Sequence, residues 1–393
     1  MKIFFIIIFA VITAYFAFCV FYVFLFSVAG LFYMNKKYAK GKNFRRFAIL
    51  VPAYKADDVI EELVSNVLLQ DYPNYDLIVI ADSMDEKLIH RLKQMSVKVM
   101  KFTAQHRTKA LALNTIMAQL PDNEYDIALI LDADNLIKDR DYLLRLNDAF
   151  NTGLQAIQTH RAAKNINTSL AVLDAASEEI NHSLLRRGHA TLGLSSSLCG
   201  SAMAFDYKLY KALMKHISSS GEDKELEILL LKNRIHIEFL DDLVVLDEKT
   251  QYAEVFVTQR ARWIANQIKQ ALNNSGEGLV QLFRGNFDFF NKVIQYFLMP
   301  RIILLTSTFF ITLVTIIFLP PLYYGIWIIF FIILSISIFF SIPRNTYNVQ
   351  LLKAMIYLPV SAYLMFRSLF RMRGATKKFN MTEHRKITDK QFS

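Results

Sequence analysis

The chain is poor in the residues that build covalent or metal-stabilised frameworks. It has two cysteines, Cys19 and Cys199, in 393 residues, and they lie far apart. A pair at this spacing indicates neither a disulfide framework nor a cysteine metal site. The sequence also shows no internal repeat and no low-complexity linker. Repeat architectures and arrays of linked modules are therefore excluded.

Charged residues are missing from long stretches at both ends. Residues 3–34 contain none, and neither do the runs 302–319 and 322–342. The whole chain is 53% hydrophobic, with 32 phenylalanines and a mean hydropathy of +0.26, which is too apolar for an ordinary soluble domain of this length. The middle, about 250 residues, has a normal globular composition and is long enough for one large domain. The sequence predicts a membrane protein with one globular domain between its apolar ends.

The first apolar run predicts one transmembrane helix. A helix over residues 3–34 is about 48 Å long at 1.5 Å per residue. This exceeds the roughly 30 Å hydrocarbon core and fits one tilted span with an interfacial end. The alternative, a cleaved signal peptide, has a much shorter apolar region that ends in small residues.

Basic residues flank this run unequally. One of them, Lys2, precedes it, and six follow it: Lys36, Lys37, Lys40, Lys42, Arg45 and Arg46. The positive-inside rule therefore places the N-terminus outside and the middle domain in the cytoplasm of a multi-pass protein of the cell membrane. Such flanks largely account for the net charge of +10, so the charge does not indicate nucleic-acid binding.

The C-terminal apolar runs predict a helical hairpin, because Pro320 and Pro321 separate residues 302–319 from residues 322–342. Aromatic and basic side chains are mixed over residues 279–297. That mixture predicts an interfacial helix just before the hairpin.

A third apolar segment, residues 351–370, contains Lys353 and Arg367 and precedes a basic tail. If this segment spanned the membrane, the tail would lie outside, against the positive-inside rule, so we favour an interfacial or re-entrant segment. The predicted division is a transmembrane helix at 1–34, a cytoplasmic domain at 44–275, an interfacial helix at 276–300, a transmembrane hairpin at 301–343, and an interfacial or membrane segment with a basic cytoplasmic tail at 344–393.

The middle domain alternates apolar strands with helices. Strands are expected at 47–51, 76–80, 97–101 and 127–131, and helices at 57–70, 85–95 and 108–119. Continuously apolar strands separated by helices are typical of a mostly parallel α/β sheet covered on both faces. Ligands of such sheets bind at the carboxyl ends of the strands. Tyr54, Asp82 and the pair Asp132 and Asp134 all follow strands of this kind, which predicts one site.

The acidic pair is the clearest candidate for a metal site. Asp132 and Asp134 flank Ala133 at the end of the apolar run 127–131. A D-x-D sequence occurs by chance in many loops. After a buried strand, however, both carboxylates can point toward one spot, and hard oxygen ligands suit Mg²⁺ or Mn²⁺ that holds a substrate phosphate.

Two further motifs follow the acidic pair. Glu222 and Asp223 come after Gly221, and Gln259, Arg262 and Trp263 form a Q-x-x-R-W pattern. This order resembles the membrane-bound family 2 glycosyltransferases, of which cellulose, chitin, hyaluronan and poly-N-acetylglucosamine synthases are the closest kind. The resemblance covers nearly the whole chain. It implies a hexosyltransferase with a GT-A-like cytoplasmic domain.

The resemblance also implies roles for the donor side of the site. Asp82 would contact the nucleotide base, commonly uracil, although an aspartate after a strand is often only a turn or cap residue. Lys109 would approach the diphosphate, although a lysine there is often a surface residue. It lies in a segment like the family's K-G-x-x-L-N, with Ala110 in place of glycine. Asp132 and Asp134 would hold the metal that neutralises the leaving diphosphate.

On the acceptor side, the resemblance implies that Asp223 of the E-D pair is the general base. The alternative is that these acids only cap a helix over residues 224–232, where Ser220 and Asp223 imitate a capping box. Arg262 would neutralise the diphosphate and Trp263 would stack on an acceptor sugar, although a tryptophan on a helix face is usually a core residue.

Other stretches match the family less sharply. Gln158 and Arg161 fit a Q-x-R stretch, and residues 197–203 resemble a loop at the donor–acceptor boundary. The tail 377–385 also looks like the end of related synthases. The family's V-P-x-Y-N-E, in contrast, has Lys55 and Ala56 after Tyr54 here, which weakens the assignment of the nucleotide.

These motifs together predict an inverting, metal-dependent transferase that moves a sugar from a nucleotide donor, UDP-linked by resemblance, to a growing β-linked polysaccharide. An alternative is single transfer to a lipid acceptor, because there are few helices for a self-contained channel unless export partners or a homo-oligomer supply more. A remote alternative is a membrane protein that senses nucleotides without catalysis. A transporter is disfavoured, since the clear spans contain no charge.

Overall fold

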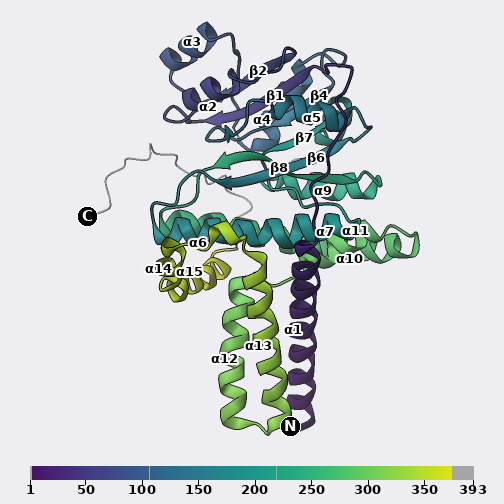
Figure 1. Ribbon diagram of the computed structural model, residues 1–393, viewed down its shortest axis with the longest axis vertical. Helices are drawn as coiled ribbons and strands as arrows, with labels where there is room; N and C mark the ends of the chain where they lie inside the picture. The colour runs from purple at the N-terminus through teal and green to yellow at the C-terminus, as the bar shows by residue number, and fades with distance from the viewer. Residues whose placement is uncertain (1, 106, 218, 374–393) are drawn as a thin grey trace.

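The computed structural model describes residues 2–105, 107–217 and 219–373. Figure 1 shows three layers: an α/β layer, a layer of helices that lie across it, and three long helices that extend away from both. The N-terminus lies at the far end of the first long helix. The predicted tail motif at 377–385 lies outside the described residues.

An eight-stranded sheet in the order β3-β2-β1-β4-β7-β6-β8-β5 forms the α/β layer. Four strand pairs are parallel, namely β1 with β2, β1 with β4, β2 with β3 and β6 with β8, and three are antiparallel. The expected mostly parallel α/β class is therefore confirmed. The strands are β1 (Phe47–Tyr54), β2 (Tyr75–Asp82), β3 (Lys98–Lys101), β4 (Ile127–Ile130), β5 (Leu136–Ile137), β6 (Ala156–Ala163), β7 (Met203–Asp206) and β8 (Ile237–Asp247).

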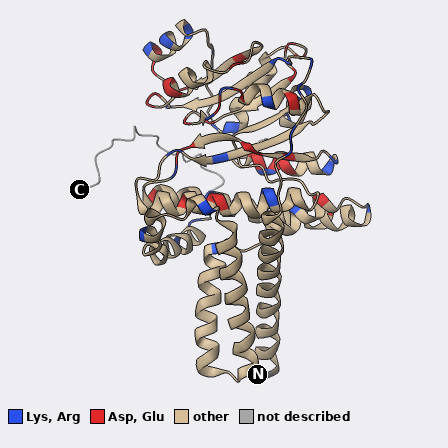
Figure 2. Ribbon diagram, viewed as in Figure 1, with Lys and Arg blue, Asp and Glu red and all other residues tan. Residues whose placement is uncertain are grey.

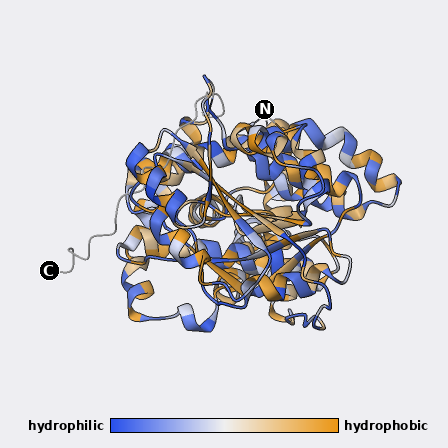
Figure 3. Ribbon diagram, turned by 90° about the horizontal axis from the view of Figure 1, so that it is seen from above, coloured by the Kyte–Doolittle hydropathy of each residue, from blue (hydrophilic) through white to orange (hydrophobic). Residues whose placement is uncertain are grey.

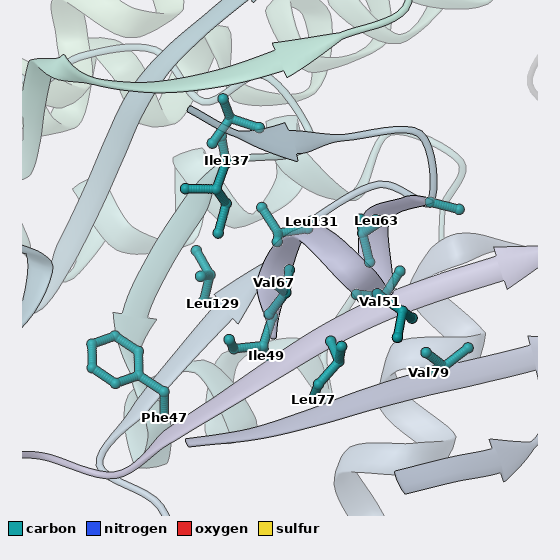
Figure 4. Packing of buried hydrophobic residues seen from close by; sticks show 14 of the residues in the cluster. Phe47, Ile49, Val51, Leu63, Val67, Leu77, Val79, Leu129, Leu131 and Ile137 are labelled. Atoms are coloured by element: carbon teal, nitrogen blue, oxygen red, sulfur yellow. The ribbon is translucent and has the colours of Figure 1, made fainter. Parts of the chain in front are cut away.

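Both faces of the sheet are buried because β1, β2 and β4 are apolar at every position in their centres. Ile49 and Val51 point into one core, which α2 (Ile60–Val67), α3 (Glu86–Gln94) and α5 (Tyr142–Phe150) cover (Figure 4). Ala48 and Leu50 point into the opposite core. It is covered by α4 (Lys109–Gln119), α8 (Tyr207–Met214), α9 (Glu222–Lys232) and α11 (Phe287–Tyr296). Each fully buried aliphatic side chain contributes about 1.5–3 kcal/mol to the free energy of folding.

The view from above shows the strands in largely hydrophobic colours, with hydrophilic segments around them (Figure 3). A second layer lies between the sheet and the long helices (Figure 1). It contains α6 (Ser169–His182), the π-helical turn η1 (Ser183–Arg187), α7 (Gly188–Thr191), α10 (Ala253–Phe283) and α11.

The long helices are α1 (Lys2–Leu31), α12 (Arg301–Phe318) and α13 (Pro321–Ser341). Phe16 of α1 packs on Trp327 of α13, with ring centres 5.1 Å apart. Figure 2 shows almost no charged residues on the three helices. Within the described residues, these three helices are long and apolar enough to cross a membrane. A fourth span is added if α14 (Val349–Met355) and α15 (Leu358–Phe370) are taken as one bent segment.

The predicted interfacial segment at 279–297 is two helices rather than one. α10 ends at Phe283, and α11 begins at Phe287. Gly285 between them has a φ of +72°, a backbone conformation that favours glycine. The Asn286 side chain then caps α11 by accepting a hydrogen bond from the backbone nitrogen of Phe289.

The third C-terminal apolar segment is also broken. It forms α14 (Val349–Met355) and α15 (Leu358–Phe370), which meet at 59°, after a short 3-10 turn, η2 (Arg344–Thr346). Pro359 lies in the first turn of α15, where its fixed φ is tolerated but a continuous helix from α14 is not. The interpretation of residues 351–370 as an interfacial or re-entrant segment stays a prediction, as do the domain boundaries.

Candidate active site

A cavity with a volume of about 1030 Å³ is lined by residues at the ends of β1 and β2 and by residues of α6 and α10. All the predicted site residues line it: Tyr54, Asp82, Lys109, Asp132, Asp134, Glu222, Asp223, Gln259, Arg262 and Trp263. They come from six separate elements and loops, so the fold brings together what the sequence spreads over about 210 residues.

Tyr54 and Asp82 are directly opposite each other, as the last pair of the parallel ladder between β1 and β2. Asp82 is buried, and its carboxylate accepts a hydrogen bond of 3.0 Å from the Ser83 hydroxyl. The Arg107 guanidinium lies 3.4 Å from the same carboxylate and 5.3 Å from the centre of the Tyr54 ring. The end of β1 and β2 is therefore an aromatic, acidic corner with a cation beside it.

Lys109 and Asp132 form an ion pair in the centre of the cavity wall. Thr108 caps α4, so Lys109 stands at the first position of that helix. Its ammonium donates to Asp132 Oδ1 and, at 2.8 Å, to the carbonyl of Gly200. Burial lowers the pKa of Lys109, but the charges of Asp132 and Glu222 more than offset this and raise the pKa above its usual value.

Asp134 is buried, and its carboxylate is held from two directions. Asn135 Nδ2 donates to Oδ1 at 3.2 Å, and the backbone nitrogen of Glu248 donates to Oδ2 at 3.3 Å. The Asp132 side chain, in contrast, is 34% exposed and faces the cavity. No group of three His, Cys, Asp or Glu side chains within the described ranges is arranged to hold a metal. Mg²⁺, however, commonly takes only one or two protein carboxylates and completes its shell with water and phosphate oxygens, so the pair fits that kind of ion.

The loop over residues 197–203 lies between the acidic pair and α9. Gln158 of β6 holds it: its Nε2 donates to the carbonyls of Ser201 and Ala202, and its Oε1 accepts from the Cys199 backbone nitrogen. Gly200 has a φ of +90°, which orients its carbonyl to accept from Lys109. The Gln158 side chain is therefore a support for this loop, and it lies within the core.

Glu222 and Asp223 open α9, whose first residue is Glu222 and whose N-cap is Gly221. The Ser220 hydroxyl makes no hydrogen bond to any described residue, so the capping box is not formed. A Cβ on Gly221 would lie 2.6 Å from the Asn266 side chain of α10. Glycine thus lets the start of α9 approach α10 closely, and this approach brings both acids to the cavity wall.

The two acids differ in environment. Burial, reinforced by the charge of Asp223 and opposed by Lys109, raises the pKa of Glu222 to about 7. Asp223 Oδ1 accepts from the Lys224 backbone nitrogen at 2.9 Å, and the Lys224 ammonium lies 3.8 Å from Oδ2. Asp223 therefore lies at a helix N-terminus and beside a cation.

The Q-x-x-R-W residues lie on α10 and line the cavity. Gln259 Oε1 accepts from the Thr250 hydroxyl at 3.3 Å. The Trp263 side chain is 37% exposed, and therefore is not a core residue. Arg260, which no motif singled out, stacks on the Trp263 ring with its guanidinium carbon 4.1 Å from the ring centre, and it pairs with Asp174 of α6.

The sequence also gave no indication of a buried ionic network below the acidic pair. Arg161 pairs with Glu178 at 3.0 Å, and the Lys249 ammonium lies 3.0 Å from Asp247 and 3.5 Å from Glu178. These side chains come from β6, α6, the end of β8 and the loop after it. Arg161 fits the Q-x-R stretch noted above, but its pairing with Glu178, which is 17 residues away in the chain, follows from the fold alone.

The family model for glycosyltransferase-like family 2 matches residues 45–266, more than half of the chain. The chain belongs to this family. Its fold is GT-A-like and it is a glycosyltransferase, as expected. The matched range contains every predicted site residue.

Two curated relatives have the same name, poly-β-1,6-N-acetyl-D-glucosamine synthase, from Staphylococcus aureus strains MSSA476 and COL. They are 25% and 24% identical over 155 residues, which is 38% of this chain and 37% of each relative. The chain therefore spans well under half the length of these relatives in the match. A mannosyltransferase from Pyrobaculum calidifontis, solved with GDP-mannose and Mn²⁺, superposes with a TM-score of 0.54 at 15% identity and covers 93% of this chain and 97% of its own. At that identity the similarity concerns the fold.

Proposed function

We propose that this family 2 glycosyltransferase transfers a sugar, with inversion, from a UDP-linked donor to an acceptor hydroxyl at the cytoplasmic face of the membrane. The observation that carries the proposal is that one cavity is lined by all the groups required. These are Tyr54 and Asp82 for the nucleotide base, basic and acidic side chains for the diphosphate and its metal, and the Asp223 carboxylate at the start of α9. Tyr54 and Asp82 would bind the uracil base, and Lys109 and Arg262 would bind the diphosphate.

The reaction is a single displacement. Asp223 accepts the proton of the acceptor hydroxyl, whose oxygen forms a bond to the anomeric carbon while the bond from that carbon to the diphosphate oxygen breaks. The transition state has oxocarbenium character, as in glycoside hydrolysis. Asp223 suits this role because its carboxylate lines the cavity at the start of α9, with the Lys224 ammonium 3.8 Å away. Glu222, whose pKa burial raises to about 7, would hold the acceptor or donor by hydrogen bonds.

Asp132 and Asp134 would hold Mg²⁺ or Mn²⁺, which supplies positive charge beside the diphosphate. Support comes from their carboxylates, which both line the cavity next to Lys109. The solved mannosyltransferase of similar fold also contains Mn²⁺ with a nucleotide sugar. Lys109, whose ammonium pairs with Asp132, would lie beside this ion and contact the diphosphate.

The acceptor we propose is a growing β-linked polysaccharide, in line with the synthase name of the curated relatives. Trp263, exposed at the cavity wall, offers a face on which a sugar ring can stack. The second candidate function is the transfer of a single sugar to a lipid. It is favoured by the apolar side chains of α12 and α13 that line one end of the cavity.

The test is UDP release by the detergent-purified chain with a panel of UDP-sugars and Mn²⁺ or Mg²⁺. We expect turnover with one donor, a loss of about 10³-fold or more in Asp223→Asn, and little change in Glu225→Gln. Glu225 lies on the same helix but does not line the cavity. Unchanged turnover in Asp223→Asn would remove Asp223 as the base. Product length at saturating donor separates a polymer from a single transfer.

A further inference from the structure

The cavity has two ends of different chemistry. The end described above is polar, whereas the end nearer the long helices has an apolar wall. Residues at the start of α12 and the end of α13 form much of it: Ile302, Leu304, Leu305, Ile338, Phe339 and Ile342. Residues of α14 and α15 complete it. Both pairs of helices lie directly below α6 in Figure 1, so this end lies where the membrane surface is predicted.

Arg301 stands between the two ends, at the first position of α12, and lines the cavity. Its Nη2 donates to the carbonyl and hydroxyl oxygens of Ser177, at 3.1 and 3.4 Å. Its other two nitrogens make no hydrogen bond to the described residues, among which no carboxylate lies within 4.0 Å of it. Arg260 and Arg186 line the same cavity as Arg301.

Arg186 is buried, lines the same cavity, and, like Arg301, has only neutral hydrogen-bond partners among the described residues. Its Nε donates to the Ser197 carbonyl at 3.1 Å, and its Nη1 lies 3.4 Å from His182 Nδ1. In the part of the chain that the structure describes, it too has no carboxylate at ion-pair distance. Two arginines at this junction thus have only neutral partners.

Arg260 adds a further donor. Arg260 is a buried residue, with its side chain 11% exposed; it lines the cavity, and its Nη2 pairs with Asp174. Its Nε is buried without a hydrogen-bond partner in the described residues. An unsatisfied buried donor is costly, and native proteins usually provide a partner for it.

The cations at this junction are not all paired. Asp174 is matched by Arg260, Glu178 by Arg161, and Asp247 by Lys249. Arg186 and Arg301, beside the apolar wall, have no carboxylate at ion-pair distance among the described residues. Arg186 is buried, and a buried charge without a counterion is strongly unfavourable, so an anion is expected here.

We propose that this end of the cavity binds a lipid with a phosphate-bearing headgroup. Arg301, with Arg260 and Arg186, holds the phosphate, for which guanidinium groups provide charge-assisted hydrogen bonds. The hydrocarbon chain lies against the apolar side chains of α12, α13 and α15. A soluble phosphate would account for the arginines but would leave that wall without a partner. The inference goes beyond the proposed function, because the lipid binds whether or not it accepts a sugar.

The test is native mass spectrometry of the detergent-purified full chain with dioleoyl phosphatidic acid or dioleoyl phosphatidylcholine. We expect the phosphatidic acid to be retained about tenfold more. Arg301→Gln should lower this retention about tenfold, in keeping with the loss of a charged hydrogen bond. Arg301→Lys should retain most of it. The control, Arg344→Gln, removes an exposed arginine close to the membrane side that does not line the cavity, and should behave as the wild type.

Three results would overturn the inference: equal retention of the two lipids, unchanged retention in Arg301→Gln, or displacement of phosphatidic acid by an equal concentration of glycerol 3-phosphate. If Arg301→Gln does not fold, Ser335→Trp narrows the apolar end and keeps every charge, and should give the same loss. UDP binding is measured on the same wild-type sample. If the wild type retained phosphatidic acid but did not bind UDP, the result would count against the proposed function and not against the lipid site.

Discussion

Arg260 lies over Trp263, with its guanidinium carbon 4.1 Å from the centre of the indole ring. The same guanidinium pairs with Asp174, so α6 fixes the arginine and the arginine fixes the ring. Cation–π contacts of this kind contribute about 0.5–2 kcal/mol. The free face of Trp263 is thereby held toward the cavity, where an acceptor sugar would stack.

Trp263→Ala should therefore lower kcat/KM for the acceptor about tenfold, because one stacking surface is lost. Its thermal midpoint should stay within about 3 °C of the wild type, since the side chain is more than a third exposed. Trp263→Phe, which keeps a ring, should recover most of the rate. Equal kinetics for Trp263→Ala and the wild type would show that the ring does not contact the acceptor.

Removal of divalent metal should abolish UDP release. With EDTA we expect a loss of at least about 100-fold, because metal charge on a leaving diphosphate contributes several kcal/mol. Added Mn²⁺ should restore the rate. Asp134→Asn should require more Mn²⁺ for half-maximal rate, whereas Asp122→Asn, an exposed carboxylate away from the cavity, should not. An EDTA-resistant rate would exclude the metal.

Much of the first half of the domain follows from the sequence. The expected strands at 47–51, 76–80 and 127–131 all appear, each within about three residues of its predicted ends. These strands are predictable because both of their faces are buried, so the apolar run is continuous. The expected helix at 108–119 appears as α4, with Thr108 as its cap.

The second half was not predicted in detail because its strands contain polar residues. β8 contains Asp241 and Asp242, and β6 contains His160 and Arg161. Their charges are tolerated in a sheet only because of partners from other elements: Arg187 donates to Asp241 at 2.8 Å. No local pattern encodes such pairs. The motif residues, in contrast, were found because their order along the chain matches a family.

His160 should make stability depend on pH. Burial disfavours its charged form, but hydrogen bonds with Asp241 and Glu179, both 2.9 Å long, outweigh this and raise the pKa of His160 to about 9. A raised pKa stabilises the folded state fully below the unfolded value of about 6.5, and this contribution, up to about 3 kcal/mol, is lost as the pH rises through about 9.

The measurement is the thermal midpoint of wild type and His160→Gln at pH 6 and pH 9.5. The variant should be clearly less stable than the wild type at pH 6, and the difference should shrink at pH 9.5. His216→Gln, at a histidine that pairs with no described acid and lies on the surface, serves as the control. A difference that is the same at both pH values would mean that folding does not raise the pKa of His160.

Lys292 and Glu227 tie the interfacial helix α11 to α9, which begins with Asp223. Both side chains are fully buried, and the ammonium lies 3.0 Å from the carboxylate. Burial raises the pKa of Glu227, but the charges of Lys224 and Lys292 outweigh this and lower it to about 2. Tyr296 of α11 also donates to the same carboxylate. The pair thus transmits the position of α11 to the helix that carries the proposed base.

Lys292→Met should destabilise the protein by about 3–5 kcal/mol, because it leaves Glu227 buried with one cation fewer. The double variant Glu227→Gln with Lys292→Met removes both charges and should recover most of the thermal midpoint. Lys269→Met, at a half-exposed pair with Glu225, should change it little, as surface ion pairs contribute at most about 1 kcal/mol. If the double variant were as unstable as Lys292→Met, packing of the lysine stem rather than charge would hold α11 to α9.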